Sequence, residues 1–581
     1  MKKLFVLTSI VLALSGSYAG ADTFIRIVQP YENASIPPVK SSFVFGAVSP
    51  ATASVIINGV AVKPYTNGGF LTMIPFEEGR FKIEAIASDG VSVSSAVRYV
   101  NVQESMGTYP ITYKHLDPLS PRTRVVLRTG DLLTLTFQAA PSGTAFFRLA
   151  GGENIPMQEQ PGEIGGIYKG VYRIQPADQF EGDDVTFSLK RKDGRKITAK
   201  AGAEVTVQRR RTPRMVELRE DAILLTGPEA DLGYYLFLLK GTRMEVTGEW
   251  GDYLRVRLTE SNEGWIRAGT ANELPVGTPP AKSVAGSIRV DSTGTSTLIE
   301  LPLQHRHAFR VDQITEDHRL LITLYGVMAD TDRIRYKTNG SVVKELSWRQ
   351  YESGTTTLDI ETTQKFGWGY DVRYEGNKLI VEIRHRPPWA PAHQLPLKGL
   401  KIAIDAGHSH QSFGTIGPWG NTEASVNLGV ANEVKKELER RGAQVVMTQD
   451  GTKEISLQDR VNLAWAERAH MFISIHADAC PEGQNPRDVD GYSVHYYHPQ
   501  SHPLARALFN VYGEKSKIRE QGLWRSNLAV CRATQMPSVL FEQGFLVVPE
   551  MEELFITPAH QALVAQSIAT AIYQFMNETK P

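Results

Sequence analysis

A change in hydrophobic periodicity near residue 400 constrains the fold of this 581-residue chain more than any other feature. Upstream, apolar residues alternate with period two in short runs, as in residues 81–86 and 133–137, which predicts β-strands. Downstream, strand-like apolar runs alternate with amphipathic stretches, and residues 424–441 and 559–576 carry apolar side chains at helical spacing. We therefore expect several small all-β modules followed by a C-terminal α/β domain, with a mostly parallel sheet covered by helices.

The length and charge of the chain limit its organisation and its partners. One hydrophobic core rarely serves a chain this long, so several domains are expected. Lys plus Arg and Asp plus Glu each number 63, which gives a formal net charge of zero. A basic surplus of the kind that marks nucleic-acid binding is missing, so we expect no nucleic acid as a partner.

The first residues have the order of a secretory signal peptide. Two lysines precede an apolar run over residues 4–14, and small residues follow it up to Ala21. The run is shorter than the roughly 20 residues that span a bilayer, and no later stretch is apolar enough, so no transmembrane segment is expected in the mature chain. We expect an exported protein, periplasmic or extracellular and associated with the cell wall. There Cys480 and Cys531 could form a disulfide or stay separate buried thiols, and the sequence leaves this open.

Four β-rich segments precede the α/β domain. In the first, Asn58-Gly59 lies between apolar strands and predicts a two-residue hairpin turn. In the third, short strands carry Trp250, Tyr253 and Trp265, a pattern that resembles bacterial SH3-like barrels; these aromatic residues are either barrel core or a ligand platform. The expected boundaries are a signal peptide at 1–21, an immunoglobulin-like β-sandwich at 22–105, a second β-sandwich at 110–210, an SH3-like barrel at 214–276, an AMIN-like β domain at 284–386, a proline-rich linker at 387–398 and the α/β domain at 399–581.

Three apolar strands of the α/β domain end in residues able to bind metal or move a proton. These strands, in residues 401–408, 471–478 and 537–545, lead to His408, His476 and Glu542. Because the carboxyl ends of parallel strands border one crevice, the three side chains are expected to meet in space.

Glu423, which opens the helix after the first strand, completes a ligand set. A catalytic zinc takes three His or carboxylate ligands and keeps a fourth position for water, and His408, Glu423 and His476 supply such a set. Glu542 is then free to accept a proton from the water and pass it to the departing nitrogen. Asp405 is either a residue that orients a ligand or a strand-end turn residue.

These motifs together resemble the zinc-dependent type-3 N-acetylmuramoyl-L-alanine amidases. The resemblance rests on residues 405–408, Glu423, residues 474–478 and residues 539–545, in this order. It implies one zinc ion on His408, Glu423 and His476, with Glu542 as the catalytic acid and base. It also implies peptidoglycan as the partner and substrate, cut between N-acetylmuramic acid and L-alanine in wall remodelling or cell separation, and makes 399–581 the catalytic domain.

The chain departs from the family pattern at two positions. The family usually has two glycines after the first histidine, where this chain has Ser-His, and a lysine after the ligand glutamate, where this chain has Ala424. His410 is thus a rival ligand, although His408 holds the motif position. His495 and His498 are interpreted as part of a strand and its exit rather than as ligands.

Some relatives carry a long helical insertion that plugs the zinc site until a partner withdraws it. Here only residues 480–490 lie between the second histidine's strand and the next, which is too short for such a helix. We therefore expect an open enzyme with no obligatory activator. Two alternatives remain: another zinc peptidase that acts on stem peptides, and a catalytically dead wall-binding scaffold, against which the four filled chemical positions argue.

Overall fold

The structure is a computed structural model that describes residues 22–580 except 106, 109, 163, 209–211, 231, 338–339, 353 and 389–393. The predicted signal peptide and residues 389–393 of the predicted proline-rich linker therefore lie outside the described residues. Within the described ranges, no helix is both long enough and apolar enough to cross a membrane.

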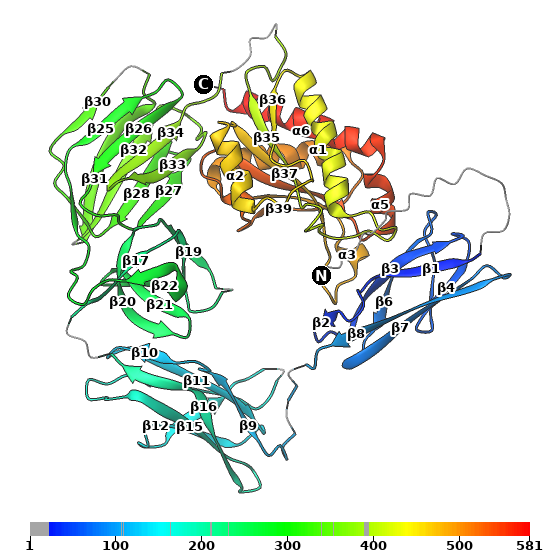
Figure 1. Cartoon of the computed structure of the whole chain (residues 1–581), viewed down its shortest axis with the longest axis horizontal. Helices are drawn as coiled ribbons and strands as arrows, with labels where there is room; N and C mark the ends of the chain where they lie inside the picture. Colours follow the sequence, from blue (N-terminus) through cyan, green and yellow to red (C-terminus); the bar gives the residue numbers. More distant parts are fainter. Residues whose placement is uncertain are drawn as a thin grey trace, which may run out of the picture.

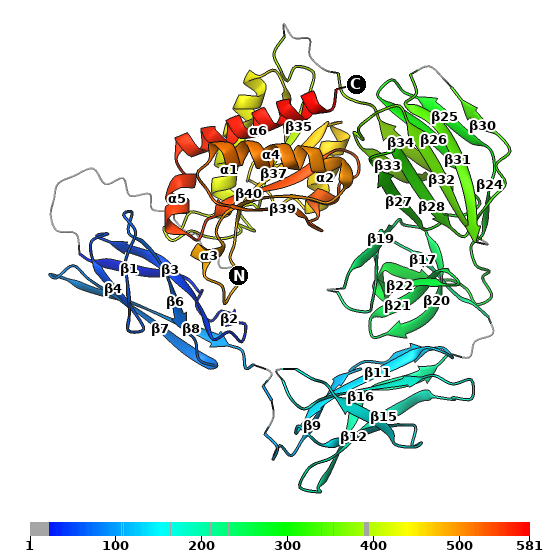
Figure 2. The same cartoon turned by 180° about the vertical axis from the view of Figure 1, so that it is seen from behind.

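The described parts of the chain are arranged as a ring (Figures 1 and 2). Four β-rich modules follow one another, and the α/β domain closes the ring by lying between the fourth module and the first. The assignment of these modules to immunoglobulin-like, SH3-like and AMIN-like families stays a prediction.

The first module consists of two sheets, with mostly antiparallel strand pairs, packed around one core. The hairpin predicted at Asn58-Gly59 is confirmed, because Ile57 pairs with Val60 and the two turn residues have φ values of 44° and 82°. The three-stranded sheet has the order β1-β3-β6 and the five-stranded sheet β2-β8-β7-β4-β5. Their bounds are β1 Phe24–Gln29, β2 Ser35–Ile36, β3 Ser41–Ser49, β4 Ser54–Ile57, β5 Val60–Val62, β6 Gly69–Pro75, β7 Gly79–Ser88 and β8 Val93–Val102.

Strand hydrogen bonds join the second and third β-rich segments into one 15-stranded sheet. The connection is the pairing of β10 with β20, where Val125 lies opposite Trp250. The second segment contains β9 Leu116–Ser120, β10 Val125–Leu127, β11 Leu132–Ala139, β12 Thr144–Leu149, β13 Ile155–Glu159, β14 Ile167–Arg173, β15 Glu181–Lys190 and β16 Lys196–Val207. The third contains β17 Arg214–Leu218, β18 Ala222–Leu225, β19 Tyr234–Leu238, β20 Arg243–Trp250, β21 Tyr253–Thr259, β22 Asn262–Arg267, η1 Ala268–Thr270 and β23 Ala271–Glu273.

The fourth module packs two larger sheets face to face, with the orders β30-β25-β26-β34-β33 and β27-β28-β32-β31, beside the pair β24-β29. Their bounds are β24 Ser283–Ala285, β25 Ile288–Ser292, β26 Ser296–Pro302, β27 Phe309–Ile314, β28 Arg319–Tyr325, β29 Val327–Ala329, β30 Ile334–Tyr336, β31 Val343–Glu352, β32 Thr355–Thr362, β33 Tyr370–Glu375 and β34 Lys378–Arg384.

The α/β domain contains a mixed six-stranded sheet of order β36-β35-β37-β40-β38-β39. The expectation of a mostly parallel sheet holds only in part, because β38 runs antiparallel to β40. Helices α1, α4 and α6 share one buried core with the sheet, and α2 packs into a second core that also contains residues of β35 and β37. The bounds are β35 Lys401–Ala406, α1 Glu423–Arg440, β36 Gln444–Met447, α2 Leu457–Ala466, β37 Met471–Asp478, α3 Pro486–Val489, β38 Tyr492–Tyr496, η2 Pro499–Ser501, α4 His502–Lys515, β39 Glu520–Arg525, η3 Val530–Arg532, β40 Ser538–Phe545, α5 Pro549–Phe555 and α6 Pro558–Glu578.

Both cysteines belong to the α/β domain and are free thiols. Cys531 is buried in the core under α2, and Cys480 is half-buried. Burial raises the pKa of each thiol to about 12, so both are protonated at neutral pH.

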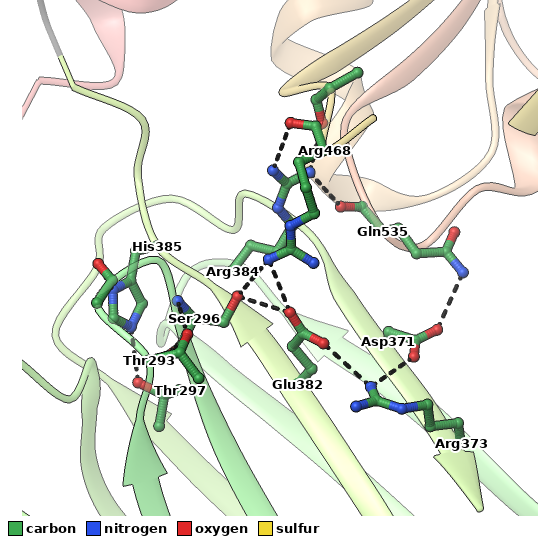
Figure 3. A network of polar contacts seen from close by, with 12 residues as sticks. Thr293, Ser296, Thr297, Asp371, Arg373, Glu382, Arg384, His385, Arg468 and Gln535 are labelled. Atoms are coloured by element: carbon green, nitrogen blue, oxygen red, sulfur yellow. Dashed lines mark hydrogen bonds and ion pairs between the residues drawn. The ribbon is translucent and has the colours of Figure 1, made fainter. Parts of the chain in front are cut away.

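A polar network joins the fourth module to the α/β domain (Figure 3). Glu382 on β34 accepts hydrogen bonds from Ser296 at 2.8 Å and from Arg468, after α2, at 2.9 Å. Beside it, Gln535 donates a hydrogen bond to Asp371 at 3.2 Å.

Aromatic rings on the same module also reach the core of the α/β domain. The ring centroids of Phe366 and Trp368 each lie within 5.3 Å of the ring centroid of Phe575. The two units are therefore firmly packed.

Candidate metal centre

The four predicted site residues meet at one end of the sheet. His408 follows β35 by two residues, while His476 and Glu542 lie within the neighbouring parallel strands β37 and β40, opposite each other. Glu423 is the first residue of α1, whose N-terminus is capped by the Thr422 side chain. All four residues line the same cavity of about 390 Å³.

Glu423 lies between the two imidazoles. Its Oε1 is 2.9 Å from His476 Nδ1, and its Oε2 is 3.2 Å from His408 Nε2. One nitrogen or oxygen from each of His408, Glu423 and His476 lies within 4.8 Å of the other two. Two imidazoles and one carboxylate at this separation form the donor set of a catalytic zinc site, so these residues fit the metal that the sequence predicts.

The electrostatics of the triad follow from this contact. Burial alone would raise the pKa of Glu423, but hydrogen bonds from His408 and His476 outweigh it and lower the pKa. Burial disfavours the charged form of His408, yet the adjacent Glu423 carboxylate raises the pKa of that imidazole. A buried carboxylate kept ionised between two nitrogen donors is suited to hold a cation.

Close packing of the backbone explains why small residues surround the two histidines and Glu423. A Cβ atom on Gly407 would lie 2.4 Å from the His476 ring, and one on Gly414 would lie 2.3 Å from Glu423 Oε2. His408 itself has φ 68°, a left-handed conformation that is unfavourable for most side chains. Backbone strain of this kind clusters at functional sites.

Glu542 is the carboxylate left outside the triad. Its Oε2 is buried and accepts no hydrogen bond from any residue that the structure describes. Desolvation, followed by the nearby charges of Asp478 and Glu423, raises the pKa of Glu542 well above its ordinary value. A carboxyl group in this state can hold a proton near neutral pH and release it to a neighbouring base.

Asp478 also lines the cavity, although no role was predicted for it. Burial raises its pKa to about 6. It lies two residues after His476 on β37, and residues two apart on a strand share a face, so strand periodicity could have identified it. By contrast, Gln29 and Tyr31 of the first module line the cavity as well, and no local sequence signal connects them to it.

Asp405 does not touch either histidine through any hydrogen bond that the structure describes. Its carboxylate accepts hydrogen bonds from Ser474 at 2.6 Å and from Arg460 at 3.1 Å. Arg460 in turn donates to the carbonyl oxygens of Ala406 and His408, at 3.0 and 3.3 Å. Asp405 therefore holds the backbone that presents His408, through Arg460.

The rival histidines are placed away from the triad. His410 is exposed and is not part of the described ligand cluster. His495 lies within β38, where its ring is 2.9 Å from Ser493 Oγ and 2.8 Å from Ser526 Oγ. His498 lies after the strand, with its Nε2 3.0 Å from the Arg532 carbonyl oxygen. Burial lowers the pKa of both His495 and His498 to about 4, so both are neutral at pH 7.

Comparison with known proteins gives matches in this part of the chain. Residues 402–574 match the family described as N-acetylmuramoyl-L-alanine amidase. The protein named "Probable cell wall amidase LytH" from Staphylococcus epidermidis is 32% identical over 184 residues, which are 31% of this chain and 60% of that protein. Its Staphylococcus aureus counterpart is 30% identical over 217 residues, 37% of this chain and 69% of that protein. The chain thus spans about 60% of the length of the S. epidermidis relative.

Solved structures also match. The N-acetylmuramoyl-L-alanine amidase AmiC2 of Nostoc punctiforme is 31% identical, with 31% of this chain and 97% of that chain covered and a TM-score of 0.29. The N-acetylmuramoyl-L-alanine amidase from Clostridium difficile 630 is 28% identical, with the same coverage and TM-score.

Proposed function

Because the chain belongs to the N-acetylmuramoyl-L-alanine amidase family, we propose that its α/β domain hydrolyses the amide between N-acetylmuramic acid and L-alanine of the peptidoglycan stem peptide. One observation carries this proposal. A ligand set of two imidazoles and one carboxylate shares a cavity with Glu542, a separate carboxylate whose buried oxygen has no partner among the described residues.

His408, Glu423 and His476 would hold one zinc ion. A zinc ion bound there supplies a Lewis acid that makes water acidic near neutral pH and polarises the amide carbonyl. The residues themselves contribute rigid placement. The Glu423 carboxylate accepts hydrogen bonds from the backbone N–H groups of Thr415 at 3.1 Å and Ala477 at 3.2 Å, which fix its orientation between the two imidazoles.

Glu542 would move the proton. As a carboxylate it accepts a proton from the attacking water, and as a carboxylic acid it donates that proton to the departing nitrogen of L-alanine. Its raised pKa favours the protonated form that the second step needs. Without this transfer the amine would have to leave as an anion.

The β-rich modules would position the enzyme at the cell wall. We propose that the protein is exported, periplasmic or extracellular, and that its β-rich modules associate with the cell wall during remodelling or cell separation. The segment between β37 and β38 contains only the four-residue helix α3, so an obligatory activator is not part of the proposal.

Digestion of purified sacculi by the full chain, with and without a chelator, tests the function. Mass analysis should find whole stem peptides with a free L-alanine amino end, in an amount that the chelator abolishes and added zinc restores. Products that retain the lactyl amide would instead identify a stem-peptide peptidase, and no soluble product from an intact zinc-loaded protein would identify a non-catalytic wall-binding protein.

A further inference from the structure

The first β module is packed against the edge of the candidate metal centre. Phe43 and Phe45 of β3 share a buried apolar cluster with Phe545, at the end of β40, and with Val547 and Val548. In Figures 1 and 2 this module, drawn in blue, lies beside α3 and α5 of the α/β domain. The end of β40 and the residues that follow it are therefore covered by the first β module.

Polar and steric contacts fix this docking. Asn67 donates a hydrogen bond to the carbonyl oxygen of Pro549 at 3.2 Å, and Gly483 donates one to Ser42 Oγ at 3.1 Å. At Gly69 a Cβ atom would come within 2.8 Å of the Pro549 side chain, so the two backbones approach as closely as a glycine allows.

The docked module also touches the loop that leads to the ligand glutamate. The Arg26 guanidinium lies 5.9 Å from the centroid of the Trp419 ring. The backbone of this loop is held from the other side, because Glu552 accepts hydrogen bonds from the N–H groups of Trp419 at 2.7 Å and Asn421 at 3.1 Å. The loop ends at the cap of α1, which begins with Glu423.

The module contributes one wall of the cavity without filling it. Gln29 and Tyr31 line the cavity together with the triad and Glu542. Tyr31 remains 44% exposed, and within the described residues the module makes no hydrogen bond or ion pair with the four site residues. A volume of about 390 Å³ is left between the two walls, which is in the range of small-molecule sites.

The chemistry of the lining indicates which part of the substrate this wall takes. Among the residues that the structure describes, those lining the cavity include three carboxylates and no Lys or Arg. The described lining therefore offers no cationic side chain to the free carboxylates of a stem peptide, whereas an uncharged N-acetylated sugar needs none. A tyrosine ring packs on the apolar face of a pyranose, and a glutamine amide offers both a donor and an acceptor.

We propose that Tyr31 and Gln29 form a sugar-binding wall that contacts the N-acetylmuramoyl residue on the acyl side of the scissile amide. This inference rests on the proposed amidase function and assigns a specificity-determining role to the first β module. The catalytic cleft is then built from the first β module together with the α/β domain, which lie next to each other in the ring.

The test compares two substrates in the full chain. One is a soluble muramoyl peptide, and the other is the same peptide carrying a lactoyl group without the sugar. Tyr31→Ala should lower kcat/KM for the muramoyl peptide roughly tenfold, mainly through KM, and leave kcat/KM for the lactoyl peptide unchanged. Tyr31→Phe keeps the ring face and should stay within about twofold of the unchanged chain on both substrates.

Phe24→Ala is the matched control. Phe24 is an aromatic residue of the same module with the same 44% exposure, and it does not line the cavity. It should leave both rates unchanged. Equal losses on the two substrates in Tyr31→Ala, a gain on both, or no change would each overturn the inference. If the unchanged chain releases no free L-alanine amino end from either substrate, the proposed function fails instead.

A cross-link tests whether the first β module is a fixed wall of the cavity or a lid that must move during turnover. Val39 Cβ lies 3.4 Å from the Cβ position of Gly483, close to the roughly 3.5–4.5 Å of a disulfide. A cysteine at Gly483 is strained by its φ of 86°, and this strain is common to the oxidised and reduced forms that the test compares. In a Cys480→Ala background, Val39→Cys with Gly483→Cys should give a cross-linked protein, verified by mass, that cleaves the muramoyl peptide equally before and after reduction. Activation by reduction would show that the module must move away, and would overturn the fixed wall.

Discussion

His476 and Glu542 are register partners on the neighbouring parallel strands β37 and β40, and both side chains reach the same cavity. Adjacent residues in register on parallel strands present their side chains to the same face of the sheet, about 4.8 Å apart along the hydrogen-bonding direction. The sheet itself therefore places an imidazole of the candidate metal centre beside the Glu542 carboxyl group.

Replacement of Glu542 should separate metal binding from turnover. Glu542→Gln keeps the shape of the side chain but cannot exchange a proton, so kcat should fall by at least about 100-fold. Zinc content, measured on the purified protein, should be unchanged because Glu542 is outside the described ligand cluster. Retained turnover in this variant would remove Glu542 from the mechanism.

His408 and His410, which both follow β35, should differ in metal binding. His408→Ala removes a donor from the cluster and should abolish stoichiometric zinc binding together with activity. His476→Ala, on β37, should have the same effect. His410→Ala is the matched control, because His410 is exposed and outside the cluster, and should retain both. Zinc loss in the His410 variant would reassign the first ligand.

Gly407 should be intolerant of even one added carbon. In Gly407→Ala the new Cβ would lie 2.4 Å from the His476 ring, so the imidazole must shift and zinc affinity should fall, roughly 10-fold or more. Gly429→Ala is the control: it lies within α1, where alanine is favoured over glycine by about 1 kcal/mol, and its nearest atom is the flexible end of Gln561 at 3.0 Å. A competition titration with a zinc-binding dye compares the two variants.

Local sequence patterns predicted the parts of this fold that depend on local chemistry. Positive φ at both turn positions requires residues such as Asn58-Gly59, and Glu423, expected to open the helix after the first strand, is the first residue of α1. The meeting of His408 with His476 followed from a topological rule for parallel strands, which holds for β35 and β37 because they are paired in parallel.

Features that depend on contacts distant in sequence were not predicted. The reversed direction of β38 relative to β40 has no local sequence signature, because the pattern of apolar residues in a buried strand is the same for either strand direction. The same applies to the pairing of β10 with β20. Tyr31 lies in a different module from the triad, and it reaches the cavity because that module docks on the α/β domain, with Phe43 and Phe45 packed at the end of β40.

The contact between the fourth module and the α/β domain should weaken in acid through Glu382. Burial opposes ionisation of this carboxyl group, but hydrogen bonds from Ser296 and Arg468 outweigh it and lower its pKa below the ordinary 4.5. The carboxylate therefore stabilises the folded state above about pH 4.5, and this contribution is lost as the pH falls through the lower folded pKa.

Thermal unfolding of the unchanged chain and of Glu382→Gln, followed from about pH 6 to about pH 3, measures this effect. At the upper end the variant should be less stable by about 1 kcal/mol, a modest value because the Arg468 side chain is 40% exposed. The difference should shrink as the pH falls, since protonated Glu382 resembles glutamine. Glu553→Gln, at an exposed position of α5, should show no such trend. A difference for Glu382→Gln that stays constant across the range would mean that the carboxylate charge does not hold the two units together.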